Sequence, residues 1–427
     1  MPDLELSCLV FPPFGLSEMC RASVWHEQQG LLSEAVEMAL EAQEFARVAA
    51  LLEQSMRPHY FYTMHEHYTL QRWLAALPDA TLEQHPRLCV HAVFLLLFSW
   101  GGHGRADCRP TTLAQIERLL HCAERAWQAE GNHSGLGQVL TFRALISREQ
   151  GDLARGARFA REALASLSDS ESPWRGGCLR ILGEEELQAG RARSARQLFQ
   201  EAWALLATTG NSYAVRATQL LLAEACFLQG ALQQAAELYR AARASAGEDL
   251  FDTGQAQLDL ARLSYEWNAL EEAWQEAQEA LDLGTRIGEE TLRVQAALVL
   301  ATIEHAREQT AAAQQRLRVL FARLPTGATP HLPLLQRRIE ALQARLALAA
   351  GDLATAERWS TTSALQRESL PRLHQEQEDL IAARLLIAQG KTEEALRLLE
   401  GWQVEAHEMG RTRREVESLV LEYDNDS

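Results

Sequence analysis

The chain has 427 residues, of which 47% are hydrophobic and 23% charged, a composition typical of folded proteins that excludes a disordered chain. The formal net charge of −17 argues against direct binding of nucleic acid, because phosphate backbones are held by basic faces. The strongest apolar stretch, Leu88–Trp100, has thirteen residues, whereas a membrane span needs about twenty, so no membrane partner is predicted.

The cysteines and the N-terminal residues predict a cytoplasmic protein. Seven cysteines are odd in number and form no CxxC pair, and several stand among apolar residues where a thiol acts as a small hydrophobe. The first residues include Asp3 and Glu5, where a signal peptide carries positive charge. The cysteine pattern fits a reducing compartment, and the acidic N-terminus argues against a secretory signal peptide.

The N-terminal part is predicted to be helical from Leu16, and Gly30–Ala35 repeats the junction pattern of the later repeats. Residues 1–15 show no pattern and stay unassigned, and residues 16–87 are predicted to form a helical region that precedes the repeats. Within it, Gly30–Ala35 has the form of a turn between two helices. Residues 42–54 predict an amphipathic helix and Leu70–Leu77 a short one.

From residue 88 to 427 the pattern predicts a superhelix of helix pairs. Leu88–Trp100 and residues 111–126 form a degenerate first pair, separated by the glycine-rich loop 101–110. Seven junctions then follow at spacings of 39, 40, 38, 40, 43 and 39 residues, and the loop 325–333 lengthens one of them. The junctions are Gly151, Gly190, Gly230, Asn268, Glu308, Gly351 and Gly390.

Small side chains mark two slots in every repeat, five residues after the junction and seven before it. Antiparallel helices joined by a tight turn need small residues where their axes come closest. We therefore expect an all-α fold, a right-handed tetratricopeptide-like superhelix of antiparallel helix pairs with repeats of about forty residues. The small residues are Gly156, Ala195, Ala235, Ala273, Ala313, Ala356 and Ala395 after the junctions, and Ala144, Gly183, Ala223, Ala261, Ala301, Ala344 and Ala383 before them.

This pattern resembles a lengthened tetratricopeptide repeat, as found in the MalT-type branch of the LuxR family of ATP-dependent (STAND-type) transcription regulators. The resemblance covers about residues 16 to 422. It is carried by the segments Arg21–Ala35, Trp73–Pro78, His85–Leu88, Ala388–Gly390 and Gly410–Thr412.

The resemblance implies a relay of an ATPase, a repeat superhelix that senses an inducer, and a DNA-binding helix-turn-helix. This chain shows only the middle part. Its single Gly-Lys-Thr, Gly390–Thr392, has Leu385 where a phosphate-binding loop needs glycine, so it is interpreted as a repeat junction. One more helix begins after Gly410, and the last repeat looks truncated. A regulator fragment, a split gene product and a stand-alone sensor all fit.

No catalytic, metal or cofactor site is predicted. The histidines of His65–His67 are two apart, whereas a zinc-binding helix places them four apart on one face. The basic run at Arg411, Arg413 and Arg414 is interpreted as a solvated helix end. We therefore expect a non-enzymatic sensing or interaction module. Its partner would be a small polar inducer, such as an oligosaccharide by analogy. The alternative is a protein- or peptide-binding scaffold unrelated to transcription.

The first helix of each repeat is expected to line a concave groove. The slot six residues before each junction changes from acidic to basic along the chain, which predicts either an ordinary solvated face or a polar groove that binds a ligand. Two aromatic residues three before their junctions, Phe227 and Tyr265, could stack on a ligand. The candidate ligand-binding residues are Glu184, Glu224, Gln255, Arg262, Tyr265, Gln295, Arg345 and Arg384.

Overall fold

The computed structural model describes residues 16–55, 67–98, 110–247, 249–324, 332–365 and 370–426. These residues form 22 helices and no strand, as the pattern predicted. They divide into two compact units, the first ending at Phe142 and the second beginning at Arg143. The predictions for residues 1–15, for His65 and Glu66, and for most of the loops 101–110 and 325–333 lie outside the described residues.

The first unit contains the helical region and the degenerate pair. The Gly30 junction is confirmed, with a φ of 74° between α1 and α2. The helix expected from residue 42 begins at Phe45, because Gln43 has a φ of 57° and turns the chain first. The described part of the strongest apolar stretch, Leu88–Phe98, lies in the largely buried helix α6. The helices are α1 (Leu16–Gln28), α2 (Leu32–Glu41), α3 (Phe45–Ser55), α4 (His67–Ala75), α5 (Asp79–Leu82), α6 (Pro86–Phe98) and α7 (Pro110–Glu130).

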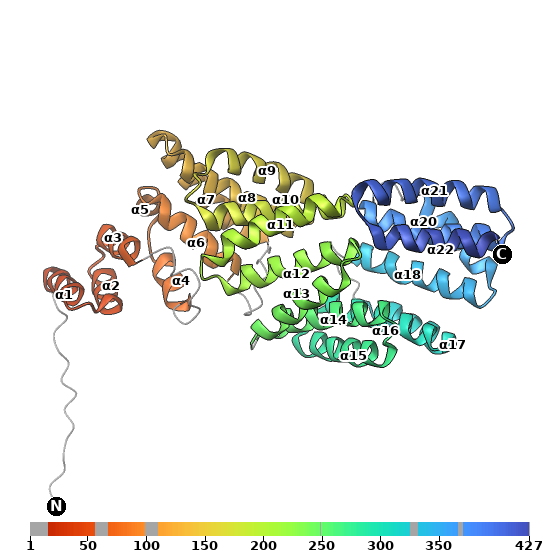
Figure 1. Ribbon diagram of the computed structural model, residues 1–427. Helices are drawn as coiled ribbons and strands as arrows, with labels where there is room; N and C mark the ends of the chain where they lie inside the picture. The colour runs from red at the N-terminus through yellow and green to blue at the C-terminus, as the bar shows by residue number, and fades with distance from the viewer. Residues whose placement is uncertain are drawn as a thin grey trace, which may run out of the picture. The chain divides into compact units, whose positions relative to one another are not determined.

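The second unit consists of helix pairs separated at the seven predicted junctions (Figure 1). Each pair is antiparallel, and successive pairs stack on one another. α8 (His133–Glu149) spans the boundary between the units. The pairs are α8 with α9 (Leu153–Ser166), α10 (Ser172–Gln188) with α11 (Ala192–Ala207), α12 (Ser212–Leu228) with α13 (Leu232–Ser245), α14 (Leu250–Glu266) with α15 (Leu270–Ile287), α16 (Glu290–Ala306) with α17 (Thr310–Ala322), α18 (Leu332–Ala349) with α19 (Leu353–Ala364), and α20 (Arg372–Ala388) with α21 (Thr392–Met409).

All seven junction residues adopt a left-handed backbone. The five glycines have φ between 72° and 85°. Asn268 and Glu308 make the same turn with φ of 57° and 63°. A side chain with a Cβ is strained in this region, least so for asparagine and more so for glutamate. The turn is therefore fixed by the packing of the repeat, since it forms even where the residue disfavours it.

The fourteen small residues are all buried, which confirms the predicted close approach of the helices. A Cβ built on Gly183 would lie 2.5 Å from Cε1 of Phe199, on the partner helix. At Gly156 the added atom would lie 2.9 Å from the carbonyl oxygen of Ala144, the small residue of the facing slot. The two slots of a repeat therefore face each other across the hairpin.

The last helix, α22 (Thr412–Asp426), corrects one interpretation of the sequence. Arg411 was expected at a solvated helix end, but its side chain is fully buried and Arg414 is only 8% exposed. Arg411 donates to the carbonyl oxygen of Gly190 over 2.8 Å, and Arg413 pairs with Glu266. The superhelix brings these distant positions together. The order of charged residues along the chain gives no information about such long-range contacts.

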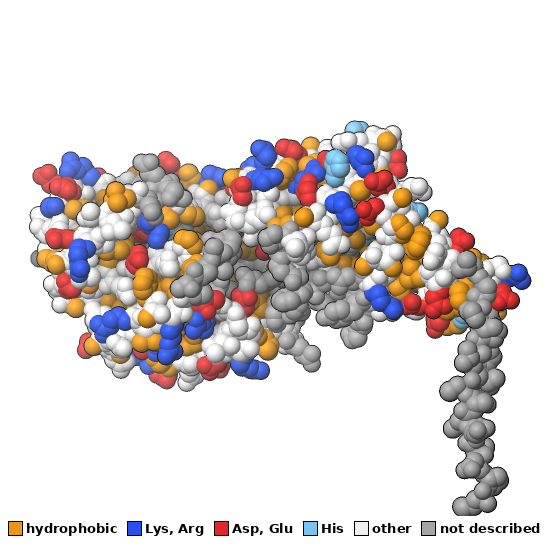
Figure 2. All heavy atoms as spheres, turned by 180° about the vertical axis from the view of Figure 1, so that it is seen from behind, with side chains coloured by type: hydrophobic (Ala, Val, Ile, Leu, Met, Phe, Trp, Pro, Cys, Tyr) orange, Lys and Arg blue, Asp and Glu red, His pale blue; other side chains and the backbone are white. Residues whose placement is uncertain are grey.

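Two further findings concern the surface. No helix in the described ranges is long and apolar enough to cross a membrane. On the face of the molecule shown in Figure 2, basic and acidic side chains are interspersed.

Candidate ligand-binding pocket

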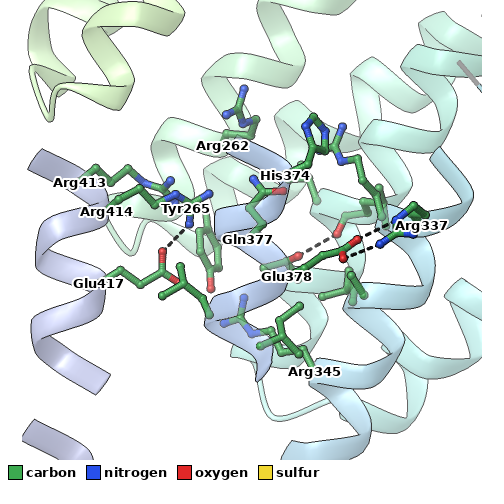
Figure 3. Close-up of a pocket in the computed structure, with 18 of the residues that line it drawn as sticks. Arg262, Tyr265, Arg337, Arg345, His374, Gln377, Glu378, Arg413, Arg414 and Glu417 are labelled. Carbon is green, nitrogen blue, oxygen red and sulfur yellow. Dashed lines mark hydrogen bonds and ion pairs between the residues drawn. The ribbon is translucent and has the colours of Figure 1, made fainter. Parts of the chain in front are cut away.

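A pocket of about 240 Å³ lies inside the second unit, among the first helices of five consecutive repeats and the last helix (Figure 3). Helices α12, α14, α16, α18 and α20 each contribute one face, and α22 contributes Arg413, Arg414 and Glu417. The rest of the lining comprises Phe227, Arg262, Tyr265, Glu266, Leu298, Val299, Thr302, Leu334, Arg337, Arg338, Ala341, Leu342, Arg345, His374, Gln377, Glu378, Leu380, Ile381 and Arg384.

Half of the candidate residues from the sequence meet in this lining. Arg262, Tyr265, Arg345 and Arg384 all line it, together with Phe227, which the same register had pointed out. The other four candidates are not in the lining. Glu184 accepts from Arg148 at 3.1 Å, and Gln255 donates to Asp259 at 3.1 Å. Glu224 forms an ion pair with Arg262 at 2.9 Å. Gln295 is half-buried on α16, also outside the lining.

Arg262 bonds to two carboxylates and packs against an aromatic ring. Its Nη1 and Nη2 donate to the two carboxylate oxygens of Glu224 at 2.9 and 3.0 Å, and Nη1 also donates to Asp259 at 3.0 Å. Its guanidinium lies 4.8 Å from the ring centre of Phe227. Tyr239 donates to Glu224 at 3.0 Å. These contacts fix the guanidinium group of Arg262 in one orientation at the pocket wall.

The two carboxylates beside Arg262 have opposite pKa shifts. Burial raises the pKa of Asp259 to about 6, although the charge of Arg262 counteracts this. For Glu224, burial also acts upward, but the charge of Arg262 and the hydrogen bonds from Arg262 and Tyr239 outweigh it and lower the pKa. Arg262 therefore has Glu224 as its main counterion.

A second clamp joins α18 to α20. Arg337 donates to both carboxylate oxygens of Glu378, at 3.0 Å from Nε and 2.7 Å from Nη2. His374 stands one turn before Glu378, and its Nδ1 is buried with no hydrogen-bond partner among the described residues. Burial, followed by the charge of Arg338, lowers the pKa of His374 to about 4. The imidazole is therefore neutral at pH 7.

A third set of pairs attaches α22 to the pocket. Glu417 accepts from Arg414 at 2.6 Å (Figure 3). It also accepts from Arg384 at 3.3 Å. Burial would raise the pKa of Glu417, but these two arginines and Arg413 lower it to about 2. Arg413 in turn pairs with Glu266 of α14. Groups from α14, α20 and α22 thus close one side of the pocket.

Several lining residues were missed by the sequence interpretation. Arg337, His374 and Glu378 were not singled out because they lie outside the slot six residues before the junction. Arg338 and Gln377 stand thirteen residues before their junctions, at the repeat position that Gln255 and Gln295 occupy, but they were not among the candidates. These residues could have been found by considering every position on the inward face of each first helix over several turns, rather than one position per repeat.

The described residues contain no group of three or more His, Cys, Asp or Glu side chains placed to hold a metal ion. The pocket offers arginine forks, one neutral imidazole, an amide and two aromatic rings. Such groups recognise a polar or negatively charged molecule and fix its orientation.

Comparison with known families adds the decisive observation. Residues 137–423 match the family described as the MalT-like TPR region, which is more than half of the chain. The chain belongs to this family. The match begins just inside α8, ends in α22 and so includes all the helices that line the pocket.

Three solved structures show the same tetratricopeptide-like right-handed superhelix. A signal transduction ATPase with numerous domains (STAND) and a tetratricopeptide repeat sensor, from Pyrococcus horikoshii, is 13% identical with a TM-score of 0.55, covering 86% of this chain and 56% of that one. The apo quorum sensor NprR from B. thuringiensis is 10% identical with a TM-score of 0.57, covering 90% and 99%.

The third structure is a Rap protein complexed with competence and sporulation factor, 12% identical with a TM-score of 0.53, covering 80% and 99%. This chain therefore spans just over half the length of the STAND protein. No curated protein matches the sequence.

Proposed function

We propose that this MalT-like repeat region is a non-enzymatic sensor that binds a small polar inducer in the pocket, as part of a LuxR-family transcription regulator. The observation that carries the proposal is the convergence of arginine, tyrosine and amide side chains from four of the six lining helices, α14, α18, α20 and α22, on one cavity. Convergent polar groups in a concave, partly apolar cavity are typical of ligand sites. Two of the similar structures, the STAND protein and NprR, are themselves described as a sensor or as containing one.

The position of α22 supports a role for this helix in transmitting ligand binding to the rest of the protein. Arg413, Arg414 and Glu417 line the cavity, while Arg411 anchors the start of the same helix to the α10–α11 junction. A ligand that contacts Glu417 or its partners would favour one placement of α22 over another. The last helix would then transmit occupancy, which slower hydrogen exchange in α22 on ligand binding would reveal.

A peptide or protein partner is the second candidate. It is favoured by the complexed Rap structure, because competence and sporulation factor is bound to a superhelix of this kind. The cavity has a volume of about 240 Å³, below the roughly 300–1,000 Å³ typical of pockets for drug-sized ligands. This volume favours a small molecule over an extended peptide.

The test compares two threonines in equivalent local settings. Thr302 lines the pocket and donates to the carbonyl oxygen of Leu298, whereas Thr361 is exposed on α19 and donates to that of Glu357. Oligosaccharides, short peptides and small anions are first tested for a thermal shift of the wild type. Thr302→Phe should fill the cavity and abolish the shift caused by the compound that binds. Thr361→Phe should leave the shift intact. Ligand protection that persists in Thr302→Phe would place binding elsewhere and contradict the proposal.

A further inference from the structure

The pocket has more positive charge than its own carboxylates balance. Seven arginines line it, against the three carboxylates of Glu266, Glu378 and Glu417. Five of the arginines form ion pairs with carboxylates. One of them, Arg262, pairs with Glu224, which is not part of the lining. The two others, Arg338 and Arg345, have no hydrogen bond or ion pair with any residue that the structure describes.

We propose that the ligand of this pocket is a small anion, a molecule carrying carboxylate or phosphate groups that Arg338 and Arg345 bind. The inference rests on the proposed function, because it takes the pocket to be the sensing site and names the chemical class of its ligand.

Composition does not explain this excess of charge. The whole chain has a formal net charge of −17, so an unbalanced group of arginines runs against the average of the protein. Unpaired charge in a partly buried site costs free energy, and proteins retain it mainly where it has a function. Burial, followed by the charge of Arg262, lowers the pKa of Arg338 to about 10, so the guanidinium remains charged at pH 7.

The two arginines line the cavity from the same helix, α18. They stand seven residues apart on α18, which places their Cα atoms about 10 Å apart along the helix. Arg338 influences the pKa of His374, and Arg345 that of Arg384, so each arginine has a different titratable neighbour. Tyr265, Gln377 and the Arg337–Glu378 clamp lie in the same close-up view (Figure 3).

This arrangement defines the ligand more closely. Arginine forks bind carboxylate and phosphate oxygens through two parallel hydrogen bonds. Two unpaired guanidinia accommodate up to two negative charges, and the volume of about 240 Å³ limits the ligand to the size of a small metabolite. The other side chains of the lining would contact the uncharged part.

The test uses succinate, its uncharged diamide and inorganic phosphate as probes of the full chain at constant ionic strength. Arg338→Gln, Arg345→Gln and the double variant remove the proposed partners. The matched control is the double variant Arg286→Gln, Arg397→Gln, which changes the net charge equally at two exposed positions outside the lining. Melting temperature and calorimetric titration report binding.

We expect succinate or phosphate, but not the diamide, to stabilise the wild type and the control. The stronger of the two anions identifies the chemical group. Each single Arg→Gln change should raise Kd about tenfold or more, and the double variant should lose the response. Without anions, the double variant should melt about 2–4 °C higher than the wild type, because two unpaired charges are gone.

Three results would overturn the inference. One is an equal response to anions in the wild type and in the Arg338, Arg345 double variant. Another is no response of the wild type to either anion at tens of millimolar. If an uncharged ligand is blocked by Thr302→Phe but binds the double variant normally, the sensing function stands and the anion inference falls.

Discussion

Nη1 of Arg411 donates a hydrogen bond of 2.8 Å to the carbonyl oxygen of Gly190, 221 residues earlier in the chain. The same guanidinium pairs with Glu376 at 3.1 Å and with Glu405 at 3.2 Å. Arg411 is fully buried and Glu376 is 1% exposed. A single side chain thus joins the α10–α11 junction to α20, α21 and α22, and the helices between them enclose the pocket.

Arg411→Ala should destabilise the second unit by about 3–5 kcal/mol, because it leaves the buried carboxylate of Glu376 without its closest partner. Burial already raises the pKa of Glu376, against the charges of Arg414 and Arg411. In the variant this pKa rises further above the unfolded value, so the carboxylate is penalised at high pH and relieved by protonation at low pH. Denaturant unfolding should therefore show a smaller deficit at pH 5 than at pH 7.

The control for this prediction is Arg191→Ala, next to Gly190. Arg191 pairs with Glu186 at 2.6 Å, but its side chain is 43% exposed. Exposed pairs contribute little, so the loss should be below about 1 kcal/mol. Equal losses in the two variants would show that the long-range contact of Arg411 does not stabilise the unit.

The two carboxylates on Arg262 predict different responses to neutralisation. Glu224→Gln should cost about 1–3 kcal/mol, because the lowered pKa of Glu224 shows that its charge is stabilised by Arg262 and Tyr239. Asp259→Asn should change stability at pH 7 by less than about 1 kcal/mol, since burial already disfavours the charged form of Asp259. Chemical denaturation of both variants checks the order, and a larger loss for Asp259→Asn would contradict it.

A third prediction concerns the strained junction. Glu308→Gly should stabilise the second unit by about 0.5–1 kcal/mol, because glycine adopts its φ of 63° without strain. Asn268→Gly, at a φ of 57°, should have a smaller effect, since asparagine tolerates this region better. Melting temperatures of both variants measure the difference, and a destabilised Glu308→Gly would mean that its side chain makes a contact worth more than the strain.

Glycine to alanine changes should have opposite signs at two helical positions. Gly401→Ala in α21 should stabilise by about 0.5–1 kcal/mol, because the new methyl group meets nothing within 4 Å. Gly183→Ala in α10 should destabilise by about 1–3 kcal/mol, because the methyl group would lie 2.5 Å from the Phe199 ring. Thermal melts of the two variants test whether the small slot is set by close packing, and stabilisation of Gly183→Ala would refute it.

The fold could be predicted from sequence because each repeat repeats the same local requirements. Ala235 and Ala273 are buried where the register placed small residues, and the turn at Gly230 falls where a left-handed residue was expected. Arg262 and Arg345 could be placed on the pocket side because the same helical face recurs in every first helix.

The closure of the pocket could not be predicted in this way. Arg413 contacts Glu266 across 147 residues, and no periodicity relates the two positions. Glu184 shares the register of Arg262, yet it lies on α10 and pairs with Arg148, because the pocket begins only at α12. Whether an arginine forms an ion pair depends on the residues of the neighbouring repeat. Arg337 pairs with Glu378 of the next repeat, whereas the adjacent Arg338 has no carboxylate partner among the described residues.

The last prediction is the pH dependence of anion binding through His374. The groups that face this imidazole are Arg337 and Arg338 from α18, Glu378 on its own helix and Arg414 from α22. An anion bound beside Arg338 should raise the pKa of His374 from about 4, so binding takes up a proton as the pH falls. The affinity for sulfate, which does not itself titrate in this range, should therefore increase between pH 7 and pH 5. His374→Gln should keep sulfate binding and lose this slope. A slope that is unchanged in the variant would assign the proton to another group, and a decrease in wild-type affinity on acidification would contradict the placement of the anion beside His374.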